Sequence, residues 1–161
     1  MLTLEDLAEL LEKNRAAARL PVKEFSLGGK LFDFNSRPAL MGVINLSADS
    51  WYRESVCLTS ENAVHRGKVL QAQGADMIDL GAESTLAHAL RVDEAGQEGK
   101  LVPIIKALRE AGILVSIETY QPAVARACIE AGANVLTLTG TDHSEEVFRM
   151  VAAHDAAVII C

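Results

Sequence analysis

The sequence predicts an α/β fold built on about five parallel strands, preceded by an N-terminal helix and a β-hairpin. Short apolar runs alternate with segments of helical periodicity along most of the 161 residues. The core is aliphatic, because 50% of the residues are hydrophobic and only 4% are aromatic. This composition suits parallel strands covered by helices better than a β-sandwich.

The chain begins with an amphipathic segment that predicts a helix over residues 4–19. Thr3 and Asp6 have the spacing of a capping box, and leucines recur at helical intervals until Pro21 ends the segment. Two roles are open for this helix: a cover for the main domain, which we favour, and an interface for another chain. We therefore divide the chain into the helix, residues 1–22, and a main domain, residues 23–161.

Residues 23–34 predict a β-hairpin. Two short strand-like runs flank Gly28 and Gly29, and consecutive glycines suit a two-residue turn because both can adopt positive φ. We expect this hairpin to sit like a plug under the sheet.

From residue 40 onward, strands and helices alternate. Strands are expected at 40–45, 76–80, 113–118, 133–138 and 156–161, and helices at 60–73, 98–111, 122–131 and 143–153. Gly74, Gly112 and Gly132 follow three of the helices, where a left-handed residue is needed. Right-handed crossovers of this kind build either a doubly wound sheet or part of a (β/α)8 barrel.

In both folds the functional groups lie at the carboxyl ends of the strands. The polar residues there are Asn45, Ser47, Asp49, Asp79, Glu83, Ser84, Thr85, Glu118, Thr119, Thr137, Thr139 and Thr141. Asp79 and Glu118, with Asn45 nearby, suit recognition of a donor-rich heterocycle or of a magnesium ion with several waters. The alternative is that the two carboxylates only accept hydrogen bonds from neighbouring loop N–H groups. Trp51 and Tyr52 suit stacking on a planar ligand, and equally suit a packing role in the loop.

Composition and charge exclude several other classes. The formal charge of −7 and the absence of a Lys/Arg cluster argue against nucleic acid as a partner. The three cysteines form no pair with disulfide or zinc spacing, so we expect free thiols. Acidic residues within the first apolar pattern exclude a secretory leader, and no run approaches the ~18 apolar residues of a membrane span. A cytoplasmic protein is expected.

Three strand ends carry a family resemblance. Residues 41–50, Met-Gly-Val-Ile-Asn-Leu-Ser-Ala-Asp-Ser, and residues 74–85, Gly-Ala-Asp-Met-Ile-Asp-Leu-Gly-Ala-Glu-Ser-Thr, resemble the two signatures of the dihydropteroate synthase family. Residues 115–119, Val-Ser-Ile-Glu-Thr, are similar to the family's Ser-Val-Asp-Thr strand. The resemblance covers residues 25–161.

The resemblance implies a pterin-binding TIM barrel. In folate biosynthesis this family of transferases condenses 6-hydroxymethyl-7,8-dihydropterin pyrophosphate with p-aminobenzoate. The implied roles are magnesium and pyrophosphate binding for Asn45, pyrophosphate binding for Thr85 and pterin binding for Glu118, with Thr137 at a further pterin contact. We add Asp79 to these substrate-binding residues because it lies at the end of a strand.

The chain also departs from the family pattern. Glu118 replaces a shorter Asp, residues 86–88, Leu-Ala-His, replace Arg-Pro-Gly, and Thr137 with Leu138 replaces Asn-Asp. These changes keep two alternatives open: a non-catalytic pterin-binding or scaffold homologue, and a pterin-dependent methyltransferase relative. The second signature favours the synthase branch over the methyltransferases.

The length predicts an incomplete barrel, because a (β/α)8 barrel usually needs ~200 residues or more. We expect either that the chain is a piece of a longer protein or that it associates, as a homo-oligomer or with another chain. Little or no turnover is expected of this chain alone.

Overall fold

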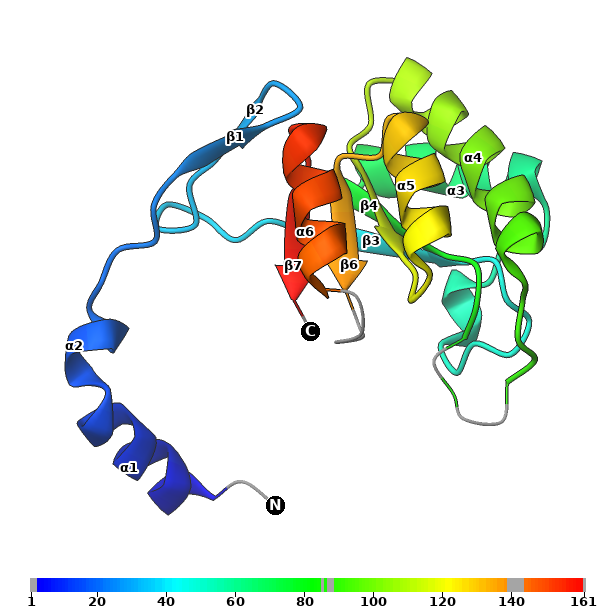
Figure 1. The fold of residues 1–161 in the computed structure, drawn as a ribbon. Helices are drawn as coiled ribbons and strands as arrows, with labels where there is room; N and C mark the ends of the chain where they lie inside the picture. The colour runs from blue at the N-terminus through cyan, green and yellow to red at the C-terminus, as the bar shows by residue number, and fades with distance from the viewer. Residues whose placement is uncertain (1–2, 85, 87–88, 139–143, 161) are drawn as a thin grey trace.

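A computed structural model describes residues 3–84, 86, 89–138 and 144–160 (Figure 1). Its centre is a parallel sheet of five strands in the order β3-β4-β5-β6-β7. The strands are β3 Met41–Asn45, β4 Met77–Gly81, β5 Val115–Glu118, β6 Val135–Leu138 and β7 Ala157–Ile160. Each strand pairs with the next one along the chain, which is the order of a (β/α) barrel rather than of a doubly wound sheet. The expected incomplete α/β barrel is confirmed.

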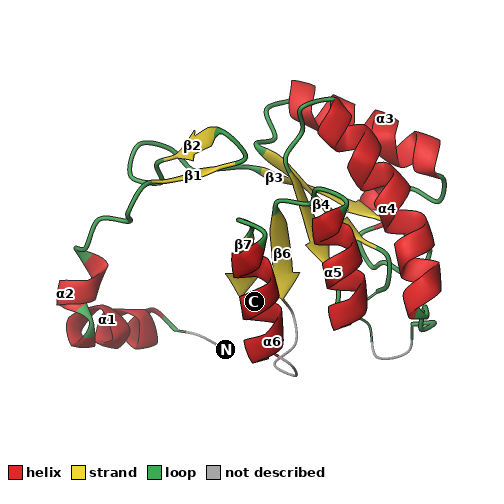
Figure 2. Ribbon diagram, turned by 45° about the horizontal axis from the view of Figure 1, so that its top comes forward, coloured by secondary structure: helices red, strands yellow, loops and turns green. Residues whose placement is uncertain are grey.

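Four helices cover one face of the sheet (Figure 2). They are α3 Ser60–Ala72, α4 Glu94–Glu110, α5 Pro122–Glu130 and α6 Ser144–Ala153. Alternate strand residues such as Ile44, Leu80 and Ile117 point to these helices and form the main core. The residues between them therefore face the other side of the sheet.

The helix ends follow their capping residues. Helix α4 begins four residues before the expected position, because the Asp93 side chain accepts a hydrogen bond from the Gly96 N–H at 2.9 Å. Gly74, Gly112 and Gly132 all have positive φ after their helices, as predicted.

The hairpin forms a plug under the sheet, as predicted. Strands β1 Phe25–Leu27 and β2 Lys30–Phe32 pair antiparallel, with Gly28 and Gly29 at positive φ between them. Leu27 and Phe32 are buried in a second core against inward-facing residues of the sheet. Gly28 sits so close to the sheet that a Cβ there would lie 2.5 Å from Leu114 Cδ2.

A buried carboxylate anchors this plug. The Asp76 side chain, just before β4, is only 4% exposed, and it accepts hydrogen bonds from Lys30 Nζ at 2.6 Å and from the Leu40 N–H at 2.8 Å. The Arg37 guanidinium donates to both carboxylate oxygens, at 2.8 and 3.1 Å. Arg37 first, and then Lys30 and the Leu40 N–H, hold the pKa of Asp76 well below its usual range despite the opposing effect of burial.

The N-terminal helix differs from the prediction in two ways. It is divided at Asn14 into α1 Leu4–Lys13 and α2 Arg15–Ala18, although the Thr3–Asp6 capping box is present. The expected cover for the main domain is wrong, because neither helix buries a residue and both extend away from the sheet (Figure 1). The extended residues around Pro21 lead the helix outward, and α3–α6 already cover the outer face of the sheet.

Cys57 and Cys128 are free thiols, and Cys128 is buried in the main core. Burial raises the pKa of Cys128 to about 12, so its thiol is unreactive at neutral pH. Across the described part of the chain, the helices are all too short or too polar to span a bilayer.

Candidate ligand-binding site at the carboxyl ends of the strands

The inner face of the sheet changes from apolar to polar towards the carboxyl ends of its strands. The apolar layer consists of Met77, Leu114 and Val135, against which the hairpin packs. Asp79 and Ser116 form the next layer, paired in register on β4 and β5. Asn45, Gly81, Glu118 and Thr137 lie in register across four neighbouring strands and form the outermost layer. A polar site therefore rests on a closed apolar floor.

Asp79 is the buried acid of this site. The Thr137 hydroxyl donates to Asp79 Oδ1 at 3.2 Å, and the Ser116 hydroxyl is a second hydrogen-bond partner. Ser116 Oγ and Thr137 Oγ1 are themselves 2.8 Å apart. Burial raises the pKa of Asp79, and the two hydroxyls offset this only in part. A ligand that donates N–H groups would relieve the cost of holding this carboxylate in a desolvated place.

Asn45 and Glu118 approach each other across Gly81. A Cβ at Gly81 would lie 3.2 Å from Asn45 Oδ1 and 3.4 Å from Glu118 Oε2. The Asn45 amide nitrogen donates to Ser55 Oγ at 2.7 Å, and this bond leaves the amide oxygen on the Gly81 side. Because glycine has no side chain, Gly81 leaves room for two side-chain oxygens from separate strands.

A cavity of about 290 Å³ opens above these residues. It is lined by Val43, Asn45, Ser50, Trp51, Tyr52, Asp79, Glu83, Ser84, Glu118 and Thr137. This volume is close to the lower limit of about 300 Å³ that small-molecule pockets usually have. Trp51 lies at the rim with 77% of its surface exposed, which is unusual for a large apolar ring.

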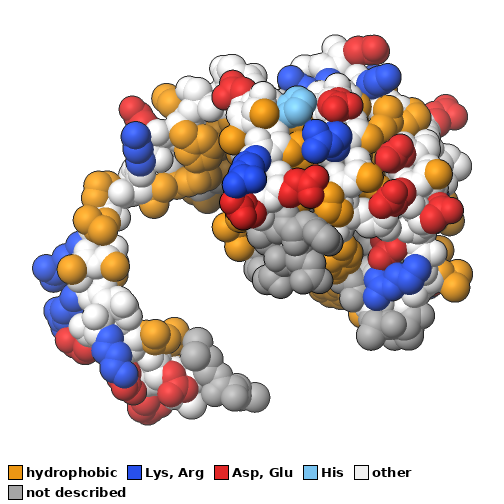
Figure 3. Space-filling view, viewed as in Figure 1, with side chains coloured by type: hydrophobic (Ala, Val, Ile, Leu, Met, Phe, Trp, Pro, Cys, Tyr) orange, Lys and Arg blue, Asp and Glu red, His pale blue; other side chains and the backbone are white. Residues whose placement is uncertain are grey.

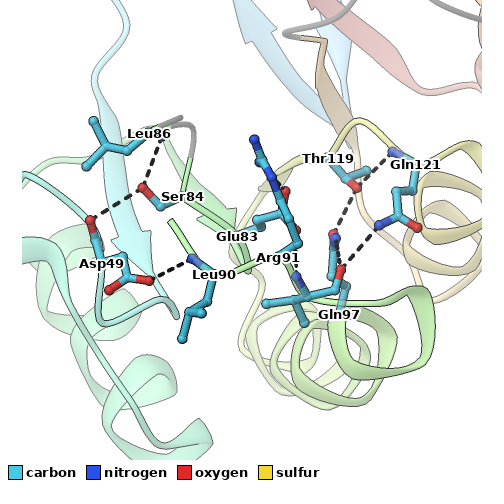
Figure 4. Close-up of polar contacts among 10 residues, drawn as sticks. Asp49, Glu83, Ser84, Leu86, Leu90, Arg91, Gln97, Thr119 and Gln121 are labelled. Atoms are coloured by element: carbon cyan, nitrogen blue, oxygen red, sulfur yellow. Dashed lines mark hydrogen bonds and ion pairs between the residues drawn. The ribbon is translucent and has the colours of Figure 1, made fainter. Parts of the chain in front are cut away.

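Two loops around the cavity are tied to each other (Figure 4). The Ser84 hydroxyl after β4 donates to the Asp49 carbonyl at 3.4 Å, and the Asp49 carboxylate accepts from the Leu90 N–H at 3.1 Å. The first and second loops are therefore held together on one side of the cavity.

A second network ties the second loop to the end of β5. Glu83 accepts hydrogen bonds from Arg91 and from the Val92 N–H, both at 2.7 Å. The buried Gln97 side chain then donates to the Val92 carbonyl and accepts from the Thr119 hydroxyl, both at 3.0 Å (Figure 4). Gln97 thus connects the loop that carries Glu83 with the residue that follows Glu118.

The structure brings four of the predicted site residues together. Asn45, Asp79, Glu118 and Thr137 all line the cavity, whereas Thr85 lies outside the described residues. The alternative role for Asp79, acceptance of loop N–H bonds, does not describe its two hydroxyl partners. Among the described residues, no group of three or more His, Cys, Asp or Glu side chains is close enough to hold a metal ion by itself.

The roles of Ser116 and Gln97 were missed. Ser116 follows an apolar residue within a strand, and only the pairing with Asp79 gives it a role. Gln97 lies on the same helical stripe as the buried Leu101 and Ile104, so a polar residue on a buried face was the available signal.

Comparison with known proteins gives consistent matches. The model of a family described as "Pterin binding enzyme" matches residues 41–161. The chain is 33% identical over 136 residues to a dihydropteroate synthase of Synechocystis sp., covering 83% of this chain and 47% of that protein. It is 34% identical over 131 residues to a dihydropteroate synthase of Streptococcus pyogenes, covering 80% and 49%.

Solved structures also match most of this chain. The dihydropteroate synthase of Yersinia pestis in a sulfonamide drug complex superposes with a TM-score of 0.74 and 25% identity, covering 86% of this chain and 50% of that one. That of Thermus thermophilus in complex with 6HMPPP has a TM-score of 0.67 and 31% identity, covering 84% and 48%. The chain spans about half the length of these relatives.

Proposed function

The chain belongs to the family of pterin-binding enzymes that includes the dihydropteroate synthases, and we propose that the cavity above Gly81 binds a reduced pterin. The buried Asp79 carboxylate carries this proposal, because its desolvation favours a ligand with several N–H donors. Pterin rings present an amino group and ring N–H groups along one edge. Asp79 accepts hydrogen bonds from that edge, and Glu118 provides a second carboxylate at the outer layer of the site.

We further propose the transfer reaction of the synthases for the complete protein. An arylamine nitrogen attacks the methylene carbon of a dihydropterin pyrophosphate, the C–O bond to pyrophosphate breaks with its electron pair, and the amine loses a proton. Attack by the amine requires no nucleophile from the protein. The residues of this chain hold the pterin by its donor edge and orient its methylene group towards the open side of the cavity.

The site residues also fit a magnesium ion. The Asn45 amide oxygen faces the open space at Gly81, and magnesium favours such an oxygen ligand together with phosphate oxygens and water. When bound, magnesium would offset the negative charge that develops on the departing pyrophosphate. We assign Asn45 to the ion, and Glu118 stays assigned to the pterin ring.

The first prediction tests binding directly. A dihydropterin pyrophosphate analogue, titrated with magnesium present, is expected to give saturable heat in calorimetry and a change in Trp51 emission. Trp51 is the single tryptophan of the chain and lies at the rim of the cavity, so its fluorescence reports on this site alone. A folded chain that shows neither signal contradicts the proposal.

A matched pair of glycine variants makes this test specific. Gly81→Ala places a methyl group between Asn45 and Glu118 and is expected to weaken binding by ~10-fold or more, about 1.4 kcal/mol. Gly99→Ala is the control, because a Cβ there meets no atom within 4 Å and its helix lies outside the cavity. Equal affinity of the two variants would place the ligand elsewhere.

The second prediction concerns the length of the acid on β5. Glu118→Asp shortens the side chain by one methylene, which restores the family residue, and is expected to tighten pterin binding by up to ~10-fold. Calorimetry with the same analogue measures the change, and Glu130→Asp on α5 is the control. Unchanged affinity would mean that the carboxylate is not directed at the ring.

A pterin binder without transfer activity is the second candidate. Thr137 favours it, because a short hydroxyl committed to Asp79 and Ser116 stands where the family has an amide. The two candidates differ in their response to p-aminobenzoate. Prior saturation with p-aminobenzoate should change the pterin affinity of a synthase site and leave that of a simple binder unchanged.

A further inference from the structure

Ser55 lies directly behind two residues of the cavity. It ends the short 3₁₀-helix η1 Arg53–Ser55 in the first loop and is only 1% exposed. Its hydroxyl accepts a hydrogen bond from Asn45 Nδ2 at 2.7 Å and donates to the Tyr52 carbonyl at 2.6 Å. Asn45 and Tyr52 line the cavity, whereas Ser55 does not. Ser55 can therefore influence a ligand only through its neighbours.

The number of protons available fixes the direction of these two hydrogen bonds. A serine hydroxyl carries one proton and a carbonyl oxygen can only accept, so the proton lies between Ser55 and Tyr52. Ser55 Oγ can then only accept from Asn45, which requires the amide nitrogen of Asn45 on that side. The amide oxygen consequently faces the space at Gly81, 3.2 Å from where a Cβ would lie. The reverse amide orientation would bring two acceptors together without a proton between them.

The main chain of Asn45 is held by the same loop. The Cys57 N–H donates to the Asn45 carbonyl at 2.8 Å, and Asn45 forms a parallel bridge with Val56. The Val56 N–H in turn donates to the Arg53 carbonyl at 3.2 Å, which closes η1. Residues 55–57 therefore fix both the backbone and the side chain of Asn45 at the end of β3.

From this arrangement, we propose that Ser55 is a positioning residue, which turns the Asn45 amide oxygen into the cavity and keeps the amide N–H groups out of it. Its effect on binding rests on the function proposed above, in which Asn45 binds magnesium. A cation is attracted by the amide oxygen and repelled by the amide N–H groups. The fixed orientation therefore favours magnesium and, with it, the pyrophosphate group of the substrate. The hydrogen bond to Tyr52 also ties this orientation to the rim of the cavity.

Side-chain hydrogen exchange tests the orientation without any ligand. In NMR spectra of the isotopically labelled full chain, the Asn45 side-chain amide protons are expected to exchange slowly with water. Ser55→Ala removes their acceptor and is expected to speed their exchange by ~5-fold or more. Ser55→Thr keeps the hydroxyl and should preserve slow exchange. Ser60→Ala, at an exposed serine outside the cavity, is the control.

The magnesium dependence of binding tests the consequence. Calorimetry with a dihydropterin pyrophosphate analogue gives the affinity with and without magnesium. Magnesium is expected to raise the affinity of the unmodified, Ser55→Thr and Ser60→Ala chains, and Ser55→Ala is expected to lose ~10-fold of this gain. The affinity of Ser55→Ala without magnesium should change by less than ~2-fold. Circular dichroism checks that this variant is folded.

The surface of the chain offers little competition for the ion. Figure 3 shows Asp and Glu side chains interspersed with Lys and Arg on the side of α4, α5 and α6. In the part of the chain that the structure describes, His, Cys, Asp and Glu side chains form no group of three or more that could hold a metal ion. A magnesium effect that depends on Ser55 therefore reports on Asn45.

Three results would overturn the proposal. The first is fast exchange of the Asn45 amide protons in the unmodified chain, or exchange that Ser55→Ala leaves unchanged. The second is an equal gain from magnesium in Ser55→Ala and in the unmodified chain. The third is a loss of affinity in Ser55→Ala by the same factor with and without magnesium, which would indicate a role in loop packing alone. An unmodified chain that binds no analogue would instead contradict the proposed function, and the exchange measurement would then decide the role of Ser55.

Discussion

Asp79→Asn is expected to lose pterin binding and yet to make the folded chain more stable at neutral pH. The amide cannot replace a carboxylate that accepts two or more donors from the ligand, so affinity should fall by ~100-fold or more. At the same time the buried charge disappears, and the amide oxygen still accepts from the Ser116 and Thr137 hydroxyls. We expect a gain of about 1 kcal/mol in the free energy of unfolding.

The pH dependence of this gain has a defined sign. Burial raises the pKa of Asp79 in the folded state above the ~3.9 of an unfolded chain. Protonation therefore favours the folded state, and the stability that it provides is lost as the pH rises through the folded pKa. The difference in the free energy of unfolding between Asp79→Asn and the unmodified chain should be absent below about pH 4 and should grow towards neutral pH.

Urea unfolding at a series of pH values measures this difference, and calorimetry measures binding. Asp155→Asn is the matched control, because Asp155 is exposed and lies at positive φ, which Asn tolerates well. A variant that is less stable than the unmodified chain at neutral pH would contradict the role of Asp79 as a desolvated acceptor.

Asp76→Asn is expected to have the largest effect on stability. The carboxylate accepts hydrogen bonds from Lys30, Arg37 and the Leu40 N–H, whereas the amide carries no charge and cannot accept on its nitrogen. Charge-assisted hydrogen bonds contribute about 1.5–3 kcal/mol each, and exposure of the two cations reduces that value here. We expect a loss of about 2–4 kcal/mol, equivalent to a fall in Tm of roughly 10 °C.

Acid titration provides a second measurement for this variant. Because the pKa of Asp76 is lowered in the folded state, its stabilising effect is complete above the unfolded value of about 4 and is lost as the pH falls further. The unmodified chain should therefore lose stability below about pH 4 more steeply than Asp76→Asn does. Hydrogen exchange should also show faster opening of the hairpin in the variant. Identical acid profiles for the two chains would contradict this account of Asp76.

Much of the fold could be predicted because its signals are local. Each strand is an apolar run and each helix has an apolar stripe, and Gly28 with Gly29 marks the hairpin turn. The division of the N-terminal helix at Asn14 was not predicted, because the helical pattern continues through that position. Periodicity also identifies an apolar face without indicating what covers it, which is why the cover role of α1 was wrong.

The candidate site was predictable only as far as strand ends could be identified. Asn45, Asp79 and Glu118 were found because polar residues follow apolar runs. The space at Gly81 was not found, since it depends on the register that places Gly81 between Asn45 and Glu118. Register is a property of two strands together, and neither strand carries it alone.

Asp76 has a further consequence for the alignment of β4. Its backbone N–H donates to the Leu40 carbonyl at 2.7 Å, while its carboxylate accepts from the Leu40 N–H at 2.8 Å. These two hydrogen bonds to one residue fix β4 against β3 at the end opposite the cavity. A slip of one position would turn Ile78 and Leu80 into the site and carry Asp79 to the helix-covered side. By fixing the register of β4, Asp76 thus determines which side chains of that strand face the cavity.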